Sequence, residues 1–327
     1  MAQESNTADR LNERLKGGLI PAAPVMFDHD NRFQHSAHAA YVDYMRSQPI
    51  SGVAVWAHTG RGLHLNPEIA RRVMQDWREG LPDKPLIAGI GPVGPQLDPS
   101  AATDATLEMA TTAALLGADA VLVYPPSWLK HNEARERLIV EHHMRVAELG
   151  LPVILFYLYE DAGGISYNAN ILSELLSLPN TVGIKMATLD SVMTYQNIAR
   201  RIQIDHPDKL LITGEDRFLA YSLRRGAQAA LIGLGAVCCE LQAELIRSHF
   251  NGNSARFLEL SDVVDRLAEV LFVHPMEGYI GRILYALSKL GVIPKDAGHD
   301  PWGPALSTGE LEKIEIVLNT IGVSYAA

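Results

Sequence analysis

Short apolar runs recur along the chain, and most are separated from the next run by a stretch with helical periodicity. The eight runs that fit buried strands are residues 18–27, 52–59, 85–91, 120–125, 152–158, 182–188, 210–214 and 229–235. Runs such as 153–156 are apolar at every position, which is typical of a parallel sheet covered on both faces. Alternating strands and helices predict a closed barrel or an open doubly wound sheet. Because the units number eight and no G-x-G-x-x-G motif follows the first run, we expect an α/β fold of the (β/α)8 TIM-barrel type.

Two of the intervening segments carry start and stop signals of helices. Asn66 and Pro67 are typical of an N-cap and a first helical position, and Gly80 is typical of a helix end. A second helix is predicted over about residues 133–149, where apolar side chains form one stripe and Gly150 ends the pattern. Both predicted helices are amphipathic and therefore have one face to bury against a sheet.

The pattern divides the chain of 327 residues into three parts. Residues 1–17 form an N-terminal polar segment, and residues 18–250 are expected to hold the barrel as the catalytic domain. Residues 251–327 continue with leucine-rich helical periodicity and predict a C-terminal helical extension. One barrel commonly takes about 200 to 250 residues, so a single barrel with additions accounts for the whole length.

The composition limits which partners and which cellular location we expect for the protein. The net charge of −10 repels phosphate backbones, so we expect no nucleic acid partner. The two cysteines, Cys238 and Cys239, are neighbours, so they cannot join distant segments and lack a metal-binding spacing. No apolar run reaches the length of a membrane span, and the N-terminus has no apolar core of a signal peptide. We therefore expect a soluble, cytoplasmic protein without a membrane partner.

Lys185 is the residue that points most directly to chemistry. It lies in the otherwise uncharged run 182–188, and catalytic groups of such barrels sit at the carboxyl ends of strands. Burial disfavours the ammonium form, which leaves a neutral amine able to form an imine with a carbonyl substrate. The alternative is a structural lysine paired with a carboxylate such as Glu215 or Asp216.

The residues around Lys185 resemble a known family. The run Val182-Gly183-Ile184-Lys185, with Leu178-Pro179-Asn180 before it and Ala187-Thr188 after it, is similar to the Schiff-base lysine strand of the dihydrodipicolinate synthase and N-acetylneuraminate lyase family. Residues 57–60, 214–216 and 276–291 agree with the family in the same order, so the resemblance covers nearly the whole chain. It implies a class I lyase that acts on a 2-oxo acid and assembles as a homotetramer, a dimer of dimers.

The resemblance also implies substrate-binding positions. Segment 57–61 takes the place of a Gly-Thr-Thr-Gly-Glu loop that binds the carboxylate of the oxo acid. Thr59 and Gly60 match that loop, whereas His58 replaces a threonine and Arg61 replaces the glutamate. Both replacements suit an anionic substrate, although a solvated loop could carry them equally well.

Further candidates come from the ends of the seventh and eighth runs. Glu215 and Asp216 could bind polyol hydroxyl groups or could cap the following helix, and we assign Glu215 to substrate binding. We assign Ile232 and Gly233 to substrate binding as well.

The family's catalytic tyrosine falls on one of two neighbouring residues. Aligning from Pro152 selects Phe156, whereas counting back seven residues from Gly164 selects Tyr157. We prefer Tyr157, because a phenol is needed to move protons as the carbinolamine loses water. Thr59 would share this relay. The alternative is an aromatic side chain that fills the core.

Two departures from the family argue against dihydrodipicolinate synthesis. Ser127 stands where the synthases have a tyrosine that reaches across a subunit interface, and, by the count from Gly164, Ala162 stands where they have an arginine. We therefore predict an aldol reaction with pyruvate or dehydration of a 2-keto-3-deoxy sugar acid. The alternatives are 4-hydroxy-tetrahydrodipicolinate synthase and a non-catalytic protein that binds an oxo acid.

No metal or other cofactor is expected, because the imine itself accepts the electrons and no set of metal ligands emerges. His142 and His143 are consecutive on the helix predicted over 133–149, so they point in different directions and do not share a metal. We expect both histidines on the helix surface.

Overall fold

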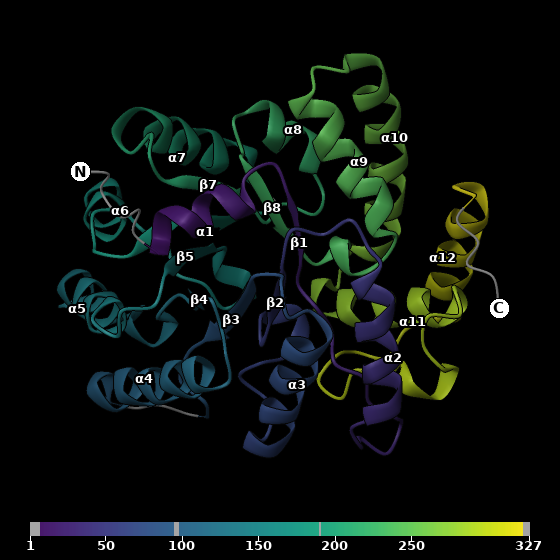
Figure 1. Ribbon diagram of the computed structural model, residues 1–327, viewed down its shortest axis with the longest axis horizontal. Helices are drawn as coiled ribbons and strands as arrows, with labels where there is room; N and C mark the ends of the chain where they lie inside the picture. The colour runs from purple at the N-terminus through teal and green to yellow at the C-terminus, as the bar shows by residue number, and fades with distance from the viewer. Residues whose placement is uncertain (1–6, 95–97, 190, 323–327) are drawn as a thin grey trace.

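The computed structural model describes residues 7–94, 98–189 and 191–322, and its strands form a barrel (Figure 1). The eight parallel strands are β1 (Leu19–Pro21), β2 (Val53–Val55), β3 (Leu86–Ile90), β4 (Ala120–Val123), β5 (Val153–Leu158), β6 (Thr181–Ala187), β7 (Leu210–Thr213) and β8 (Ala229–Ile232). Each strand pairs with the next in the chain from β2 to β8, and β8 pairs with β1. An isolated parallel bridge between Ala22 and Ala54 completes the circle. The predicted (β/α)8 barrel is confirmed.

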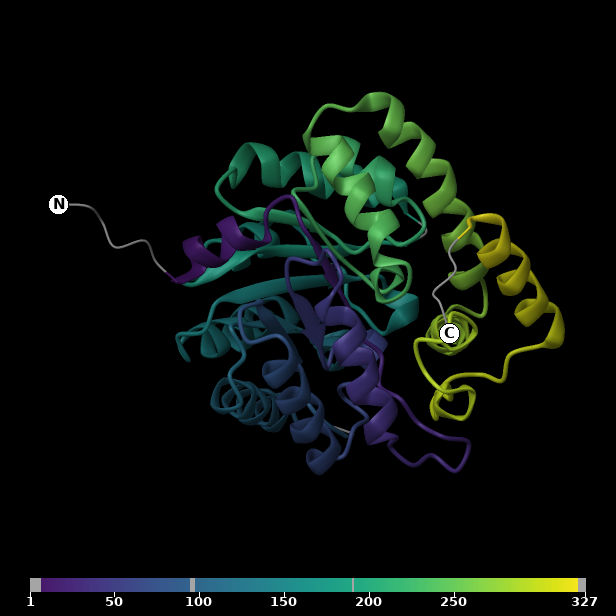
Figure 2. The same cartoon turned by 45° about the vertical axis from the view of Figure 1, so that its right-hand side comes forward.

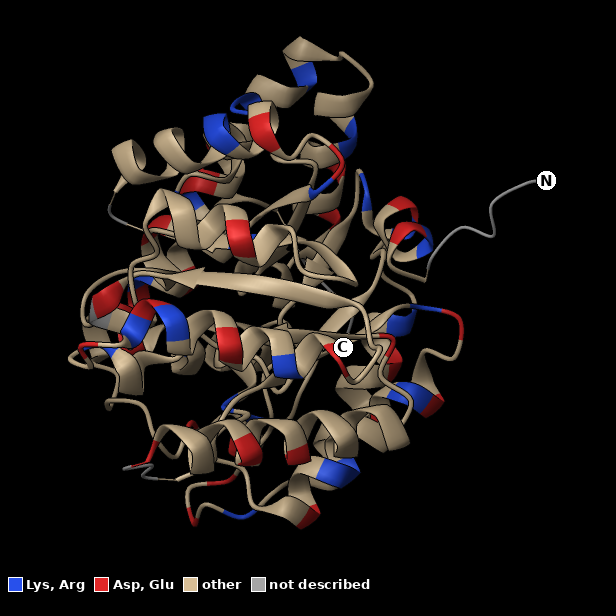
Figure 3. Cartoon of the chain, turned by 90° about the vertical axis from the view of Figure 1, so that its left-hand side faces the viewer, with Lys and Arg blue, Asp and Glu red and all other residues tan. Residues whose placement is uncertain are grey.

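Eight helices cover the barrel from outside. They are α2 (His35–Arg46), α3 (Pro67–Gly80), α4 (Pro99–Leu115), α5 (Arg135–Ala147), α6 (Ala169–Leu176), α7 (Val192–Asp205), α8 (Leu219–Arg224) and α9 (Cys239–Phe250). The N-cap predicted for α3 is confirmed, because the side chain of Asn66 accepts a hydrogen bond from the N–H of Ile69. Charged residues of both signs lie over the outer helices and loops (Figure 3).

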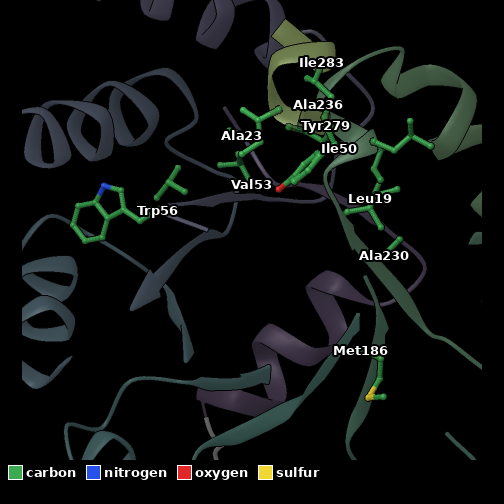
Figure 4. Packing of buried hydrophobic residues seen from close by; sticks show 14 of the residues in the cluster. Leu19, Ala23, Ile50, Val53, Trp56, Met186, Ala230, Ala236, Tyr279 and Ile283 are labelled. Carbon is green, nitrogen blue, oxygen red and sulfur yellow. The ribbon is translucent and has the colours of Figure 1, made fainter. Parts of the chain in front are cut away.

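Alternation along each strand sorts side chains into two layers. In β5, Ile154, Phe156 and Leu158 belong to the cluster that fills the barrel interior, whereas Leu155 and Tyr157 belong to the layer between strands and helices. Figure 4 shows part of that outer layer, which extends into the C-terminal helices. A shift of one residue in the sequence therefore moves a side chain from the interior of the barrel to its outside.

The expected surface position of His142 and His143 is wrong, because both rings are buried. Thr103 Oγ1 lies 3.0 Å from His142 Nδ1, and His143 Nδ1 lies 2.8 Å from the carbonyl oxygen of Ile139. The ring of Trp128 packs against His142 edge to face. Burial lowers the pKa of both histidines, so both are neutral core residues between α4, α5 and the barrel.

The N-terminal segment is helical over α1 (Thr7–Leu15). Ala8, Leu11 and Leu15 are buried and join the cluster of the barrel interior. Helix α1 precedes β1 directly and lies at the end of the barrel at which the strands begin (Figure 1). The opposite end is left for the site.

The C-terminal helices are α10 (Ser254–Leu271), α11 (Tyr279–Lys289) and α12 (Thr308–Thr320), and they lie together on one side of the barrel (Figure 2). The guanidinium of Arg282 is fully buried among them and donates to Glu310 Oε1 at 2.8 Å and to the carbonyl of Val273 at 2.8 Å. Within the described residues, no helix combines the length and apolar character needed to cross a membrane.

Candidate functional site

Lys185 lies on the interior face of β6, between Phe156 of β5 and Ile212 of β7. Its side chain is buried, and Nζ lies 4.3 Å from the centre of the Phe156 ring. Gly214 leaves room for it, because a Cβ there would come within 2.6 Å of Lys185 Cε. The strand pattern and this glycine together hold the amine inside the barrel near the carboxyl ends of the strands.

Burial lowers the pKa of Lys185 to about 8, because it disfavours the ammonium form, while Asp216 and Glu215 act in the opposite direction. Among the described residues, no carboxylate oxygen lies within ion-pair distance of Nζ. The geometry therefore argues against the alternative that Lys185 is held in a structural ion pair. A substantial neutral fraction of the amine is present near pH 8.

Glu215 does not line the cavity beside Lys185, so its expected position in substrate binding needs correction. Its Oε1 accepts hydrogen bonds from the N–H of Thr188 at 2.6 Å and from Thr188 Oγ1 at 2.8 Å, and its Oε2 accepts from the N–H of Leu189 at 2.9 Å. The carboxylate therefore fastens the loop after β6 to the loop after β7. The loop after β6 begins at Thr188, three residues after Lys185.

Asp216, rather than Glu215, lines the cavity. Its Oδ1 accepts a hydrogen bond from the N–H of Leu234 at 2.7 Å. Burial raises the pKa of Asp216 to about 7, while Leu234 and Lys185 favour the charged form. Both acidic residues were candidates from the sequence. The sequence alone does not indicate which of the two side chains points into the cavity.

His58 and Thr59 meet a residue of the C-terminal extension. Both lie in a short 3-10 turn after β2, and both line the cavity with Lys185. The hydroxyl of Tyr279 lies 3.0 Å from His58 Nδ1 and 3.0 Å from Thr59 Oγ1. On the other side of the ring, His58 Nε2 lies 3.7 Å from Glu277 Oε1. The side chains of the loop predicted to bind a carboxylate therefore contact polar groups of the C-terminal extension.

Gly233 lines the same cavity and admits two aromatic rings of the extension. A Cβ at this position would come within 3.1 Å of Phe272 Cζ, 3.1 Å of Tyr279 Cε2 and 3.2 Å of Thr59 Oγ1. The rings of Phe272 and Tyr279 stack with their centres 4.8 Å apart. Glycine is therefore the residue that lets the extension approach the end of β8.

Three other predicted substrate-binding residues do not line the cavity. The guanidinium of Arg61 binds Asp300 and Glu277 instead of lining the cavity. Gly60 approaches the carbonyl of Ala23, which a Cβ would meet at 2.7 Å, and its N–H donates to the carbonyl of Ala57 within the turn. Ile232 packs in the outer layer, and its carbonyl accepts from the N–H of Ala22 in the strand ladder.

The structure places Phe156, and not the predicted Tyr157, at the cavity. Phe156 lines the cavity, whereas Tyr157 lies in the outer layer, where its ring packs edge to face against Tyr167. Phe156 lies directly opposite Lys185 in the ladder between β5 and β6. β5 therefore presents the ring of Phe156, and no phenol, to the cavity.

The cavity beside Lys185 is small, about 40 Å³, and two wider chambers adjoin it. One chamber, of about 420 Å³, shares Leu158 and Ala162 with the cavity, and the other, of about 540 Å³, shares Phe272 and Met276. The shared walls also contain polar side chains, His58 toward the first chamber and Tyr159 and Glu277 toward the second. In the part of the chain that the structure describes, no group of three or more His, Cys, Asp or Glu side chains could hold a metal ion.

Several lining residues were not singled out from the sequence, above all Phe272, Glu277 and Tyr279. All belong to the C-terminal extension, where the sequence showed only helical periodicity and a general likeness over 276–291. Nothing in a run of helical residues indicates which one contacts a turn such as that of Thr59, 220 positions earlier in the chain. A tertiary contact decides this.

A model of the Dihydrodipicolinate synthetase family matches residues 15–320. The chain belongs to this family. Membership confirms the resemblance and the predicted class, a Schiff-base-forming lyase that acts on a 2-oxo acid.

Relatives in the family carry two different names. The chain is 27% identical over 279 residues to a 4-hydroxy-tetrahydrodipicolinate synthase of Brucella abortus, which covers 84% of this chain and 89% of the relative. Among solved structures, an N-acetylneuraminate lyase of Mycoplasma synoviae matches with a TM-score of 0.75 at 20% identity, over 94% of this chain and 98% of the other. A family protein of E. coli K12 in complex with pyruvate matches with a TM-score of 0.80 at 19% identity, over 93% and 98%. The structural matches establish the shared barrel.

Proposed function

We propose that Lys185 is the residue that forms the Schiff base, by attack of Nζ on the C2 carbonyl of a 2-oxo acid. The observation that carries this proposal is the buried amine of lowered pKa, without an ion pair to a described residue, at the inner end of a cavity. A neutral amine is the form that adds to a carbonyl. Once water has left, the protonated imine accepts electrons from C3, so that a C3 proton or the bond between C3 and C4 can be broken.

Thr59 and the turn that contains it are proposed to hold the carboxylate of the oxo acid. Thr59 lines the cavity from the middle of a short 3-10 turn, so its hydroxyl stands beside the backbone N–H groups at the beginning of that turn. His58 lies beside it as a further hydrogen-bonding group. This assignment retains two of the predicted residues and leaves Arg61 outside the substrate contacts.

Pyruvate is the proposed oxo acid, combined with or released from an aldehyde; dehydration of a 2-keto-3-deoxy sugar acid uses the same imine. The small cavity fits the oxo-acid end of such a molecule, and the adjoining chambers leave space for the rest. The pyruvate-bound relative supports this choice. We further propose that the protein is a cytoplasmic homotetramer, as expected from the sequence. The similar structures include a monomeric dihydrodipicolinate synthase variant, so the oligomeric state stays a prediction.

Borohydride is expected to trap a covalent adduct when the protein is mixed with pyruvate. Reduction converts the imine into a stable amine, which adds the mass of the reduced oxo acid to one lysine. Peptide mapping by mass spectrometry should place that mass on Lys185. An adduct on another lysine would remove the assignment, and the absence of any adduct would favour a non-catalytic protein.

The rate of imine formation is expected to rise with pH through about 8 and to level off above it. Deprotonation of Lys185 supplies the reactive amine, and burial lowers its pKa to about 8 despite Asp216 and Glu215, which favour the ammonium form. An exposed lysine would give a midpoint near about 10.4. Timed borohydride quenching at saturating pyruvate, from pH 6 to pH 10, measures the midpoint. A rate that still rises steeply above pH 9.5 would contradict the low pKa.

Aspartate semialdehyde is expected to be a poor partner for the pyruvate enamine. Ala162 lines the cavity, and Ala162 and Ser127 both line the adjoining chamber. In the synthases a tyrosine stands at the place of Ser127 and, by the count from Gly164, an arginine stands at the place of Ala162. Loss of a charged hydrogen bond costs roughly 1.5 to 3 kcal/mol, about one to two powers of ten in rate constant. A coupled assay with dihydrodipicolinate reductase tests this. A kcat/KM near about 10⁴ M⁻¹s⁻¹ or above would restore the synthase activity that the curated relatives carry by name.

A further inference from the structure

The cavity has a carbonyl-reactive amine, but the strand beside it offers no acid. Formation of an imine requires a proton for the hydroxyl group that leaves C2, and formation of the enamine requires a base for the C3 proton. Phe156 has no ionisable group, and Tyr157 lies outside the barrel wall. The proton donor has to come from another element that lines the cavity.

Tyr279 meets the geometric requirements. It stands at the first position of α11, its ring stacks on Phe272, and Gly233 gives it access to the end of β8. Figure 4 shows it among core residues of the barrel wall, although its backbone belongs to the extension. The phenol lines the cavity together with Lys185.

The hydrogen bonds of Tyr279 form a chain that leads out of the cavity. Thr59 Oγ1 and His58 Nδ1 each lie 3.0 Å from the phenol oxygen, so the phenol can accept from Thr59 while it donates to His58. The opposite nitrogen of His58 faces Glu277, whose side chain is 47% exposed. The 3.7 Å between His58 Nε2 and Glu277 Oε1 is longer than a hydrogen bond, so a proton passes from the phenol to Glu277 only when this gap closes or a water molecule bridges it.

We propose that Tyr279, supplied by the C-terminal extension, is the proton-transferring phenol of this enzyme, and that His58 connects it to solvent through Glu277. The inference rests on the proposed imine at Lys185 and adds the acid and base that this imine requires. It assigns to the extension a catalytic group, in addition to its part in covering the barrel.

The protons balance through one cycle. When Nζ of Lys185 bonds to C2, a proton moves from nitrogen to the carbonyl oxygen and gives the carbinolamine. Tyr279 then donates its hydroxyl proton to that oxygen. The bond between C2 and oxygen breaks, water leaves, and a protonated imine remains on Lys185. The phenolate recovers a proton from C3, which yields the enamine and a neutral phenol. One proton of the released water thus comes from Lys185 and the other from the hydroxyl of Tyr279, and the C3 proton then restores that hydroxyl.

The electrostatics agree with these roles. Burial raises the pKa of Tyr279 well above its usual value, so the group rests as the neutral acid. Burial lowers the pKa of His58 to about 4, although Glu277 acts in the opposite direction, so its imidazole is neutral and able to accept a hydrogen bond. A neutral phenol beside a neutral imidazole is the resting state that the first proton transfer needs.

Exchange of the methyl protons of pyruvate in D₂O, followed by NMR, measures the C3 step without knowledge of the aldehyde. We expect Tyr279→Phe to lower the maximal exchange rate by about 10²-fold to 10⁴-fold, the range for lost general acid–base catalysis. Borohydride should still trap pyruvate on Lys185 in this variant after long incubation. Tyr157→Phe, with its phenol outside the cavity, should exchange within threefold of the unmodified enzyme.

Two results would overturn the inference: exchange by Tyr279→Phe within threefold of the unmodified enzyme, or an equal loss in Tyr159→Phe, which removes another phenol that lines the cavity. Failure of the unmodified enzyme to form any adduct would instead remove the proposed imine. The two failures are therefore distinguishable.

A variant of His58 tests the outer part of the chain even if Tyr279→Phe does not fold. His58→Asn keeps a polar group near the phenol and removes the imidazole that accepts a proton. We expect the maximal exchange rate to fall about 10-fold to 100-fold at saturating pyruvate, with little change in the pyruvate concentration for half-maximal rate. A change confined to that concentration would show that His58 only binds the carboxylate and would overturn its part in proton transfer.

Discussion

Lys185→Met is expected to abolish both borohydride trapping and deuterium exchange of pyruvate, with a loss of about 10⁴-fold or more in the exchange rate. Methionine has a similar length and no charge, so it fits the apolar interior between Phe156 and Ile212 without an amine. The fold should be intact or more stable, because no charge has to be buried. NMR exchange, mass spectrometry and circular dichroism measure the three quantities.

Lys209→Met is the matched control. Lys209 is partly buried, and its Nζ donates to the carbonyl of Thr181 at 2.9 Å, at the opposite end of β6 from the cavity. Exchange and trapping should stay close to those of the unmodified enzyme. Equal losses in the two variants would mean that removal of any lysine near β6 disturbs the barrel, and the special role of Lys185 would be lost.

Arg61→Met is expected to reduce the free energy of unfolding by about 3 to 5 kcal/mol, the cost of leaving a buried charge without its partner. Arg61 Nη2 donates to Asp300 Oδ2 at 2.7 Å and Nε donates to Oδ1 at 3.2 Å, and the Asp300 side chain is only 4% exposed. The pair fastens the turn after β2 to the extension. Urea unfolding measures the effect as a lower midpoint.

The double variant Arg61→Met with Asp300→Leu separates this structural role from substrate binding. Removing both charges should restore most of the stability, because a buried ion pair and an apolar pair of similar volume are often close in free energy. If Arg61 instead bound substrate, Arg61→Met would raise the pyruvate concentration for half-maximal exchange and leave the unfolding midpoint unchanged. That outcome would reinstate the contact expected from the sequence.

The strands and outer helices could be predicted because each is specified by a local pattern. Every predicted strand run contains or overlaps one observed strand, and the Asn66 cap lies where its side chain and the following proline require it. Burial of a lysine in an uncharged run is a local signal of the same kind. Lys185 therefore stood out before any contact was known.

The direction in which a side chain points was harder to predict, because neighbouring residues of the same kind lie in opposite environments. Phe156 and Tyr157 occupy opposite faces of one strand, so an error of one position selected a phenol outside the barrel. Glu215 and Asp216 differ in the same way: one fastens two loops, and the other lines the cavity. His142 and His143 were expected on the surface, because their polarity does not reveal that the helix has neighbours on two sides.

The sequence by itself determined the alternation of strands and helices, the barrel they form and the position of the buried lysine, because each depends on spacing within a short segment. Only the tertiary structure decided which side chains surround that lysine. Tyr279 reaches Thr59 across 220 positions of the chain, and Arg61 reaches Asp300 across 239. Such contacts depend on how the extension packs against the closed barrel, and no periodicity within either segment specifies them.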